Sequence, residues 1–376
     1  MLNATVIKAE MAKQGLSQAA LAESCGVSRE SVSNWLAGES IPRPAKLRTL
    51  AQKLNLKVEE LLGAPSAPLP VVAFRTRERK PVTASAEDAG IEVGRHFRQL
   101  LPYTNVKALF APRHLIAPSL DEKYISEAAA AKRSEMELGP TDPISDELLL
   151  EQFHEFGAFL VPVFWGGDRE GHENALSVYL PDTLSSWVVF NLGCRQDDFK
   201  YWLAHELGHC LTLHTLRGNE GETFAEKFAQ YLLFPDELAA QCLSRMKGTN
   251  DRLAVAAWYA GQHGISVVTV VRAVQRVASA RGEVFEKLDT DEFFDNWKAN
   301  REGVPTVAKK YFETDKPTWM EYIIRSEKVF HTPVFKALAE FQRQEGGRSP
   351  AFIAAALNLG LIDSVELSHA LWERTH

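Results

Sequence analysis

Several features are scarce in this sequence of 376 residues. It has four cysteines, Cys25, Cys194, Cys210 and Cys242, none in a CxxC pair, so no disulfide framework is indicated and a reducing compartment fits. The N-terminus lacks the charged start and apolar core of a signal peptide. The longest apolar runs, such as 265–271, are too short to span a bilayer. We therefore expect a soluble, cytoplasmic protein with no membrane partner.

The chain also lacks an excess of positive charge. Its net charge is -7, which excludes a broadly basic surface and confines any nucleic-acid binding to a local patch. Hydrophobic residues make up 45% and charged residues 24%, an ordinary globular balance. The length suggests two or three domains as a prior.

Changes of composition along the chain predict four segments. Residues 1–63 form a helix-rich unit, and 64–82 are expected to be a linker, because Gly63 to Pro70 holds three prolines and no charge. A basic stretch with Arg75, Arg77, Arg79 and Lys80 follows. We expect a second domain over 83–281, with its core at 157–236, and a helical region of unknown role over 282–376.

Within the second domain, helical patterns cover 86–101 and 122–138, and a further helix restarts at Ser145 or Asp146, either of which can cap it. Three β-type runs follow, GAFLVPVFW, ALSVYL and SSWVVFN. A long helix is expected from near Asp197. The chain is predicted to be helical again from Pro235 to about Arg281, and its last forty residues to form two or three short helices.

The N-terminal segment has the spacing of a helix-turn-helix. Ser17 can cap one helix, Gly26 supplies a sharp turn, and Ser28 can cap the next helix. The pattern closely resembles the Cro/C1-type (XRE-family) DNA-binding domains of phage repressors over about sixty residues. The predicted apolar positions that hold the helices together are Leu21, Val27, Val32, Trp35, Leu36, Leu47, Leu50, Ala51 and Leu54.

In that geometry the second helix presents its N-terminal residues to the major groove of double-stranded DNA. Residues 1–62 carry eight Lys and Arg against six Asp and Glu, a net charge of +2, so a single copy would bind weakly. We therefore expect that the chain binds double-stranded DNA as a homodimer, or that the basic stretch strengthens binding. The expected operator lies in the chain's own promoter. Lys46 is a further candidate for a phosphate contact. The predicted DNA-contacting residues are Gln18, Ser28, Arg29, Glu30, Ser33, Asn34 and Arg43.

The central motif is His205-Glu206-Leu207-Gly208-His209. Residues four apart share one face of a helix, so both imidazoles can reach one metal ion. Glu206 sits one step round, where it can act on water beside the metal without binding the metal. We expect one Zn²⁺ per chain, because zinc accepts imidazole nitrogen in a tetrahedral site that keeps an open position.

A catalytic zinc site needs a third protein ligand, and an acidic pair follows on a predicted helix. Glu222 and Glu226 are four residues apart, as in the gluzincin arrangement of HExxH followed by ExxxD. We choose Glu222 as the ligand and Glu226 as the residue that orients a histidine through its free N–H. Glu220 is the alternative ligand.

HELGHCLTLH followed by ETFAEKFAQYLLFP resembles the ImmA/IrrE metallopeptidases, whose pattern is HExGH and then ExxAN-FA-x-LLMP. The resemblance covers roughly 120–270, and many members carry a Cro/C1-type domain. Glu226 replaces the usual Asn or Asp, and Phe234 replaces Met. The expected fold is therefore multidomain and mainly α, with an all-α head, an α+β zincin-like domain with a small three-stranded sheet, and a helical C-terminal region.

The expected chemistry is peptide hydrolysis, with Glu206 as the general base and an unidentified donor for the oxyanion. Tyr201, His214 and Tyr231 are the candidate donors. Cys210 follows a ligand directly but faces another side of the helix, so core packing is the favoured interpretation.

Two functions remain open from the sequence. In the first, a DNA-binding regulator is fused to a zinc endopeptidase that cleaves a specific regulatory protein. The resemblance implies that the partner is a repressor or a toxin, in a stress, mobile-element or toxin–antitoxin response. In the second, the chain is a repressor or antitoxin whose zinc domain senses or binds a partner with little proteolysis.

Overall fold

A computed structural model of the chain describes residues 2–37, 40, 42–62, 68–75, 84–104, 112–164, 175–300, 303–344 and 350–374. The chain divides into two units, Met1–Pro68 and Leu69–His376. Arg77, Arg79 and Lys80 of the basic stretch lie outside the described residues.

The first unit is a bundle of short helices, and its predicted turn is confirmed. Gly26 adopts a left-handed conformation at the end of helix α2 (Gln18–Cys25), and the hydroxyls of Ser17 and Ser28 accept hydrogen bonds from the backbone N–H groups of Ala20 and Ser31. These contacts satisfy otherwise unpaired groups at the helix ends. The helices are α1 (Ala4–Lys13), α2 (Gln18–Cys25), α3 (Arg29–Ala37), α4 (Pro44–Leu54) and α5 (Val58–Leu61).

The predicted apolar positions of this unit form its core, with Val27 partly buried and the other eight buried. Two further elements complete the core: Ile7 and Met11 from α1, and Leu61 from α5. The sequence pattern did not place these because α1 and α5 lie outside the helix-turn-helix spacing.

Lys46 holds the turn rather than standing free for a phosphate. Its ammonium donates to the backbone carbonyls of Cys25 and Gly26, at 2.9 and 3.1 Å. These carbonyls end helix α2, where the helix dipole favours a positive charge. Lys46 thus joins α4 to the turn, and its contact with a phosphate stays a prediction.

The second unit is built on a mixed sheet of four strands in the order β1-β3-β4-β2. β1 pairs antiparallel with β3, β3 antiparallel with β4, and β2 parallel with β4. The prediction of three strands is wrong by one, because residues 71–75, within the expected linker, form β1. The strands are β1 (Val71–Arg75), β2 (Phe159–Val163), β3 (Ala175–Leu180) and β4 (Ser185–Asn191).

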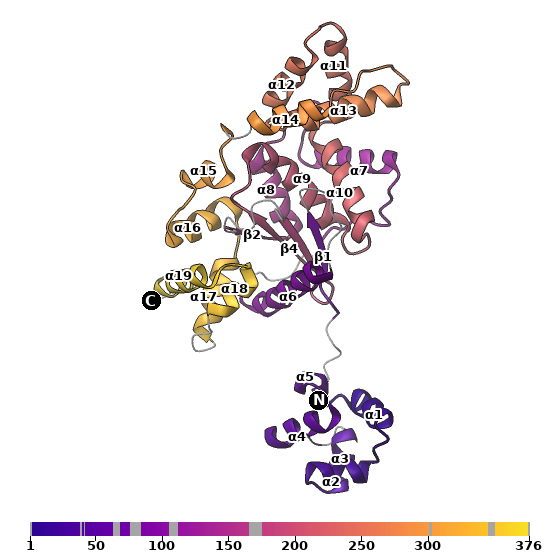
Figure 1. Cartoon of the computed structure of the whole chain (residues 1–376), viewed down its shortest axis with the longest axis vertical. Helices are drawn as coiled ribbons and strands as arrows, with labels where there is room; N and C mark the ends of the chain where they lie inside the picture. The colour runs from indigo at the N-terminus through magenta and orange to yellow at the C-terminus, as the bar shows by residue number, and fades with distance from the viewer. Residues whose placement is uncertain are drawn as a thin grey trace. The chain divides into compact units, whose positions relative to one another are not determined.

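Helices cover both faces of this sheet (Figure 1). On one face Trp187 of β4 stacks on Phe97 of α6 (Ala84–Leu100), with ring centroids 4.6 Å apart. On the other face Phe190 of β4 meets Phe199 of α9 (Gln196–Thr212). Alternate residues of a strand point to opposite faces, so β4 joins both layers.

Helices α9 and α10 (Gly218–Leu233) pack against each other at Gly208. A Cβ atom at position 208 would lie 3.0 Å from the Cα of Ala225 and 3.3 Å from Phe228. These distances are shorter than most Cβ contacts, so a residue without a side chain fits here without displacing its neighbours. The contact sets the distance between the HExxH helix and the helix that carries the acidic pair.

Helices α11 to α13 pack on one another, and α16 and α17 pack against the sheet. The region after residue 281 shares the core of the second unit, since the buried Tyr322 hydroxyl donates to the carbonyl of Pro162 on β2. The remaining elements are η1 (Leu101–Tyr103), α7 (Glu122–Glu135), α8 (Asp146–Phe156), α11 (Asp236–Lys247), α12 (Arg252–His263), α13 (Val267–Ala280), α14 (Asp291–Asn300), α15 (Val307–Phe312), α16 (Trp319–Phe330), α17 (Val334–Gln344), α18 (Pro350–Leu357) and α19 (Leu361–Glu373).

A buried polar network fastens α9 to its neighbours. Asp146, at the start of α8, accepts hydrogen bonds from Lys310 at 2.6 Å and Tyr311 at 3.1 Å, both on α15. Lys200 of α9 lies 4.0 Å from the same carboxylate and donates to the carbonyl of His263 at 2.7 Å. Burial lowers the pKa of Lys200, and Asp146 opposes that shift. Three elements, α8, α12 and α15, are thus tied to the N-terminal half of the HExxH helix.

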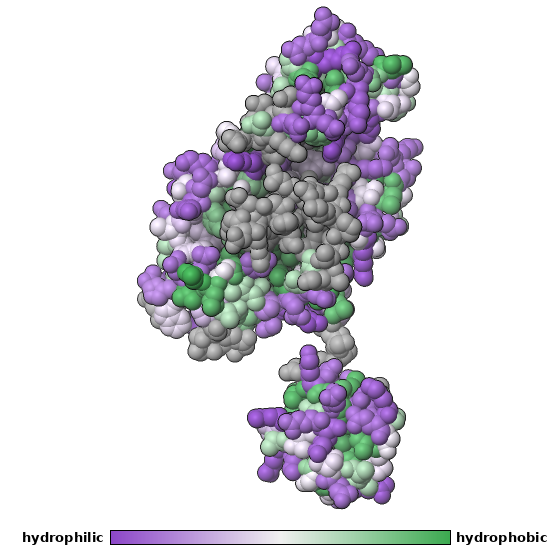
Figure 2. Space-filling view, viewed as in Figure 1, coloured by the Kyte–Doolittle hydropathy of each residue, from purple (hydrophilic) through white to green (hydrophobic). Residues whose placement is uncertain are grey.

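Hydrophilic residues predominate on the surface over α11 to α13 (Figure 2). Among the described residues, no single helix is long and apolar enough to cross a membrane, although the bent pair α18 and α19 reaches that composition together.

We expect Gly208→Ala to lower the free energy of unfolding by about 1–2 kcal/mol. Overpacking costs about 1–3 kcal/mol, and the gain in helix propensity offsets up to about 1 kcal/mol of that. Gly261→Ala in α12 is the matched control, because nothing lies within 4 Å of the place that a Cβ atom would take there. Gly261→Ala should raise the free energy of unfolding by about 0.5–1 kcal/mol. Equal effects of the two substitutions in urea denaturation would contradict this account of the helix contact.

Candidate metal centre and DNA-reading helix

Three side chains from two helices converge in the second unit. On α9, the Nε2 atoms of His205 and His209 lie 3.1 Å apart. On α10, the carboxylate of Glu222 lies 3.4 Å from the Nε2 of His205 and 3.1 Å from that of His209. The structure thus brings the predicted ligands together in one group.

The spacing of these donors fits a single metal ion. A tetrahedral zinc ion with ligands at about 2.0–2.2 Å holds neighbouring donor atoms about 3.3 Å apart. The three observed separations lie close to that value. Two imidazole nitrogens and one carboxylate are also a donor set that zinc accepts. The group is therefore a candidate His-His-Glu metal site.

The electrostatics of the group favour an ionised carboxylate. Burial opposes ionisation of Glu222, but hydrogen bonds from His205 and His209 outweigh it and hold the pKa of Glu222 below its usual range. An ionised carboxylate is the form that binds a cation. Gly221 also permits close packing here, since a Cβ atom would lie 3.0 Å from the carbonyl of Leu216 and 3.9 Å from the His209 ring.

Glu206 is buried beside this group and has a fixed partner. The Ser177 hydroxyl on β3 donates to Oε2 of Glu206 at 2.6 Å, and both side chains are buried. Sequence reasoning missed Ser177; its one signal is a polar residue in the otherwise apolar run ALSVYL. A hydrogen bond of this kind fixes the orientation of a carboxylate.

Cys210 is buried in the core on another side of α9. Burial, and then the neighbouring Glu206, raise the pKa of its thiol well above the ordinary value. The side chain is therefore a protonated packing residue, as its position on the helix indicated.

Of the three candidate oxyanion donors, Tyr201 has a ring contact with a residue of the group. Its ring centroid is 6.5 Å from that of His205, one helical turn away on the same face of α9. Its hydroxyl donates to the backbone carbonyl of Glu226 at 3.4 Å. Glu226 itself follows Glu222 by one turn of α10, outside the three-residue group.

His214 is not part of the metal group and packs against another histidine. Its ring stacks on His114, with centroids 4.2 Å apart, and His114 also meets Tyr179 edge-on. Burial lowers the pKa of His214, and burial together with His214 lowers the pKa of His114 to about 4. The two rings thus form a neutral stacked pair at neutral pH.

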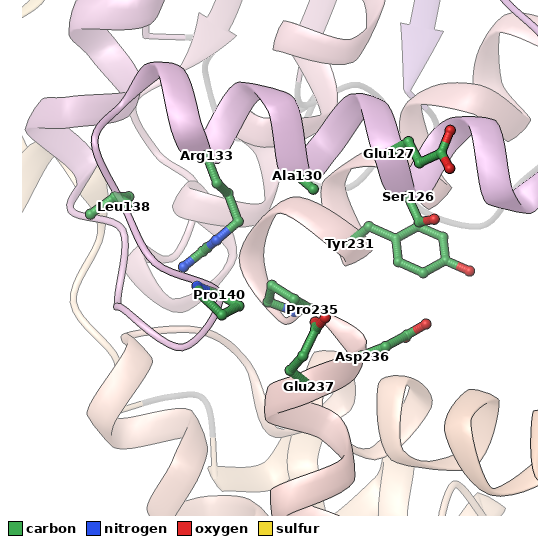
Figure 3. A pocket seen from close by; sticks show the side chains of 10 residues that line it. All are labelled: Ser126, Glu127, Ala130, Arg133, Leu138, Pro140, Tyr231, Pro235, Asp236 and Glu237. Atoms are coloured by element: carbon green, nitrogen blue, oxygen red, sulfur yellow. The ribbon is translucent and has the colours of Figure 1, made fainter.

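Tyr231 lies in a separate pocket between α7, α10 and the start of α11 (Figure 3). The guanidinium of Arg276 on α13 lies 4.1 Å from the centroid of its ring. Glu127, Asp236 and Glu237 also line this pocket, and the metal-group residues do not. This placement separates Tyr231 from the metal group.

In the first unit, α3 carries its predicted base-reading residues on the outside. Arg29, Glu30 and Ser33 are exposed and Asn34 is half-buried. Ser28 caps α3, and its hydroxyl also lies 2.9 Å from that of Ser31. Gln18, the first residue of α2, is half-buried, and Arg43, which precedes α4, is exposed.

Comparison with known proteins identifies the first unit. A helix-turn-helix family model matches residues 7–61. No curated protein and no solved structure matches the chain. The helix-turn-helix domain implies DNA binding and suggests a transcriptional regulator. The match does not reach the metal group, so the likeness to metallopeptidases rests on the motif residues themselves.

We expect the full chain to bind one zinc ion, and Glu222→Ala to weaken that binding by at least about 100-fold. Loss of even an outer partner of a metal ligand weakens binding about 10- to 100-fold. Glu220→Ala, an exposed carboxylate two residues earlier, is the matched control and should bind normally. Metal analysis and competition with a chelating dye measure both. Equal zinc affinity in the two variants would exclude Glu222 as a ligand.

Proposed function

We propose that this chain is a DNA-binding regulator whose second unit is a zinc-dependent endopeptidase that cleaves a specific regulatory protein. The observation that carries the proposal is the arrangement around α9. Two histidines and Glu222 form one donor group, and Glu206 lies beside it with its carboxylate held by Ser177. A metal-binding group with an adjacent, oriented carboxylate is the minimum that metal-assisted peptide hydrolysis needs.

His205, His209 and Glu222 would hold the zinc, as proposed from the sequence. When bound, zinc supplies Lewis acidity to a peptide carbonyl and lowers the pKa of water. Glu206 accepts a proton from water and returns it to the leaving amine. Ser177 keeps the carboxylate in position by donating to Oε2. Tyr201 is the proposed oxyanion donor, because it lies on the His205 face of α9. Glu226 keeps its proposed role of orienting a histidine.

The proposed substrate is a regulatory protein, either a repressor or a toxin. The support is the presence of a helix-turn-helix domain in the same chain, which suggests a transcriptional regulator. We also propose an operator in the chain's own promoter and a homodimer, because a head with a net charge of +2 needs a second copy to bind well.

A second function is favoured by the burial of the site. His205 is 0% exposed and His209 1%, while the Glu222 side chain is 32% exposed. A metal held mainly by two buried histidines can act as a sensor or as a partner-binding module with little proteolysis. Repression or antitoxin activity would then follow from metal occupancy alone.

Glu206→Gln separates these two functions. The amide keeps the size of the side chain and should leave zinc binding intact, while cleavage falls by about 100- to 10,000-fold through loss of the general base. Mass spectrometry of new protein N-termini compares cells that express wild type and variant, with Glu220→Gln as the carboxyl-to-amide control. A wild-type pattern of N-termini and a wild-type cellular response in Glu206→Gln would refute the peptidase.

For the head, we expect Arg29→Ala with Asn34→Ala to weaken binding to the chain's own promoter by at least about 30-fold. A good bidentate base contact contributes about 1–3 kcal/mol of discrimination. Lys53→Ala is the control, since Lys53 is an exposed cation near the end of α4. A mobility-shift titration at fixed salt measures both. Unchanged binding by the double variant would show that α3 does not read this DNA.

A further inference from the structure

Strand β1 lies beside both elements that build the metal group. In its antiparallel register with β3, Ala73 lies opposite Ser177 and Val71 opposite Tyr179. Directly opposed residues share a face of the sheet. Val71 and Ala73 accordingly pack with Tyr179 and with Leu213, the residue that follows α9. β1 also contacts α10, the helix that carries Glu222.

The edge that β1 occupies is the one an incoming peptide would use. β3 is paired with β4 on its other side, so its outer edge is the remaining row of backbone donors and acceptors. Extended peptides bind proteins by adding a strand to such an edge. A peptide in this position would run past Ser177 and therefore past Glu206.

We propose that the outer edge of β3 is the binding surface for an extended substrate peptide, and that β1 is an internal strand that covers this surface until it is displaced. This inference rests on the proposed peptidase function. β1 is five residues long, so the pairing to be broken is short.

The contacts of β1 indicate which side chains a peptide bound at this edge can carry. Val71 and Ala73 show that the face toward α9 accepts small apolar side chains at alternate positions. The favoured substrate segment is therefore extended, with a small residue opposite Ser177 and no proline where the backbone pairs. Along the chain, β1 begins at Val71, after the last helix of the DNA-binding unit, which ends at Leu61.

The test measures binding of a fluorescent peptide with the sequence of residues 69–75, LPVVAFR, to the zinc-loaded full chain. All variants carry Glu206→Gln so that the peptide is not cut. The parent protein carries Glu206→Gln alone. Adding Ala73→Pro should release β1, because proline cannot donate a hydrogen bond to β3. This variant should bind the peptide at least about tenfold more tightly than the parent. Val72→Cys with Val178→Cys joins opposed residues on the far face from Ser177. Oxidation of that pair should abolish binding, and reduction should restore the parent level.

A peptide of scrambled order is the control for sequence-independent binding. Equal binding of LPVVAFR to parent and oxidised protein would overturn the proposal, as would a folded Ala73→Pro variant that binds no better than the parent. Should Ala73→Pro fail to fold, hydrogen exchange of the double-cysteine protein decides. The amides of β3 that face β1 should exchange faster than those that face β4, and oxidation should suppress that difference. No difference before oxidation would overturn the proposal.

These outcomes are distinct from those for the proposed function. Binding is measured without cleavage, so a covered edge can be confirmed in a chain that cuts nothing. Conversely, a chain that cuts its substrate with β1 locked in place is a peptidase that uses another surface.

Discussion

The close approach of α9 to α10 at Gly208 is the contact on which the metal group depends. It brings Glu222 within 3.1–3.4 Å of two imidazoles that already share one face of α9. The sheet supplies the next layer, because β3 carries the serine that holds Glu206. The buried network around Asp146 fixes the base of the same helix. Helix packing and hydrogen bonds from neighbouring elements thus hold the donor atoms and Glu206 in position.

The candidate functional residues of the two units differ in their exposure to solvent. The head presents Arg29, Glu30 and Ser33 to solvent on a short helix, as a DNA-reading surface requires. The second unit buries both histidines of its donor group and leaves the Glu222 side chain 32% exposed. A buried site must open to act on a protein, whereas a sensing site need not. We propose that β1 controls this access, because it covers the edge of β3 on which an extended peptide would bind.

Local patterns in the sequence predicted the parts whose structure is set by near neighbours. The helix-turn-helix, its caps at Ser17 and Ser28, and the His-His-Glu group all follow from spacing along helices. Residues paired across long separations could not be found in this way. β1 was predicted to be part of a linker because proline and arginine flank a five-residue run, and its partner β3 lies a hundred residues later. Ser177, Lys46 and the separate placement of Tyr231 and His214 likewise depend on tertiary contacts.

Zinc K-edge X-ray absorption of the full chain tests the central claim most directly. The account predicts one zinc ion with two imidazole nitrogens and one carboxylate from the protein, and a further light-atom donor at the open position. Sulfur among the ligands would contradict it, since the four cysteines of the chain are buried and lie outside the group. A spectrum of hydrated zinc alone would also contradict it, because no protein site would then hold the ion.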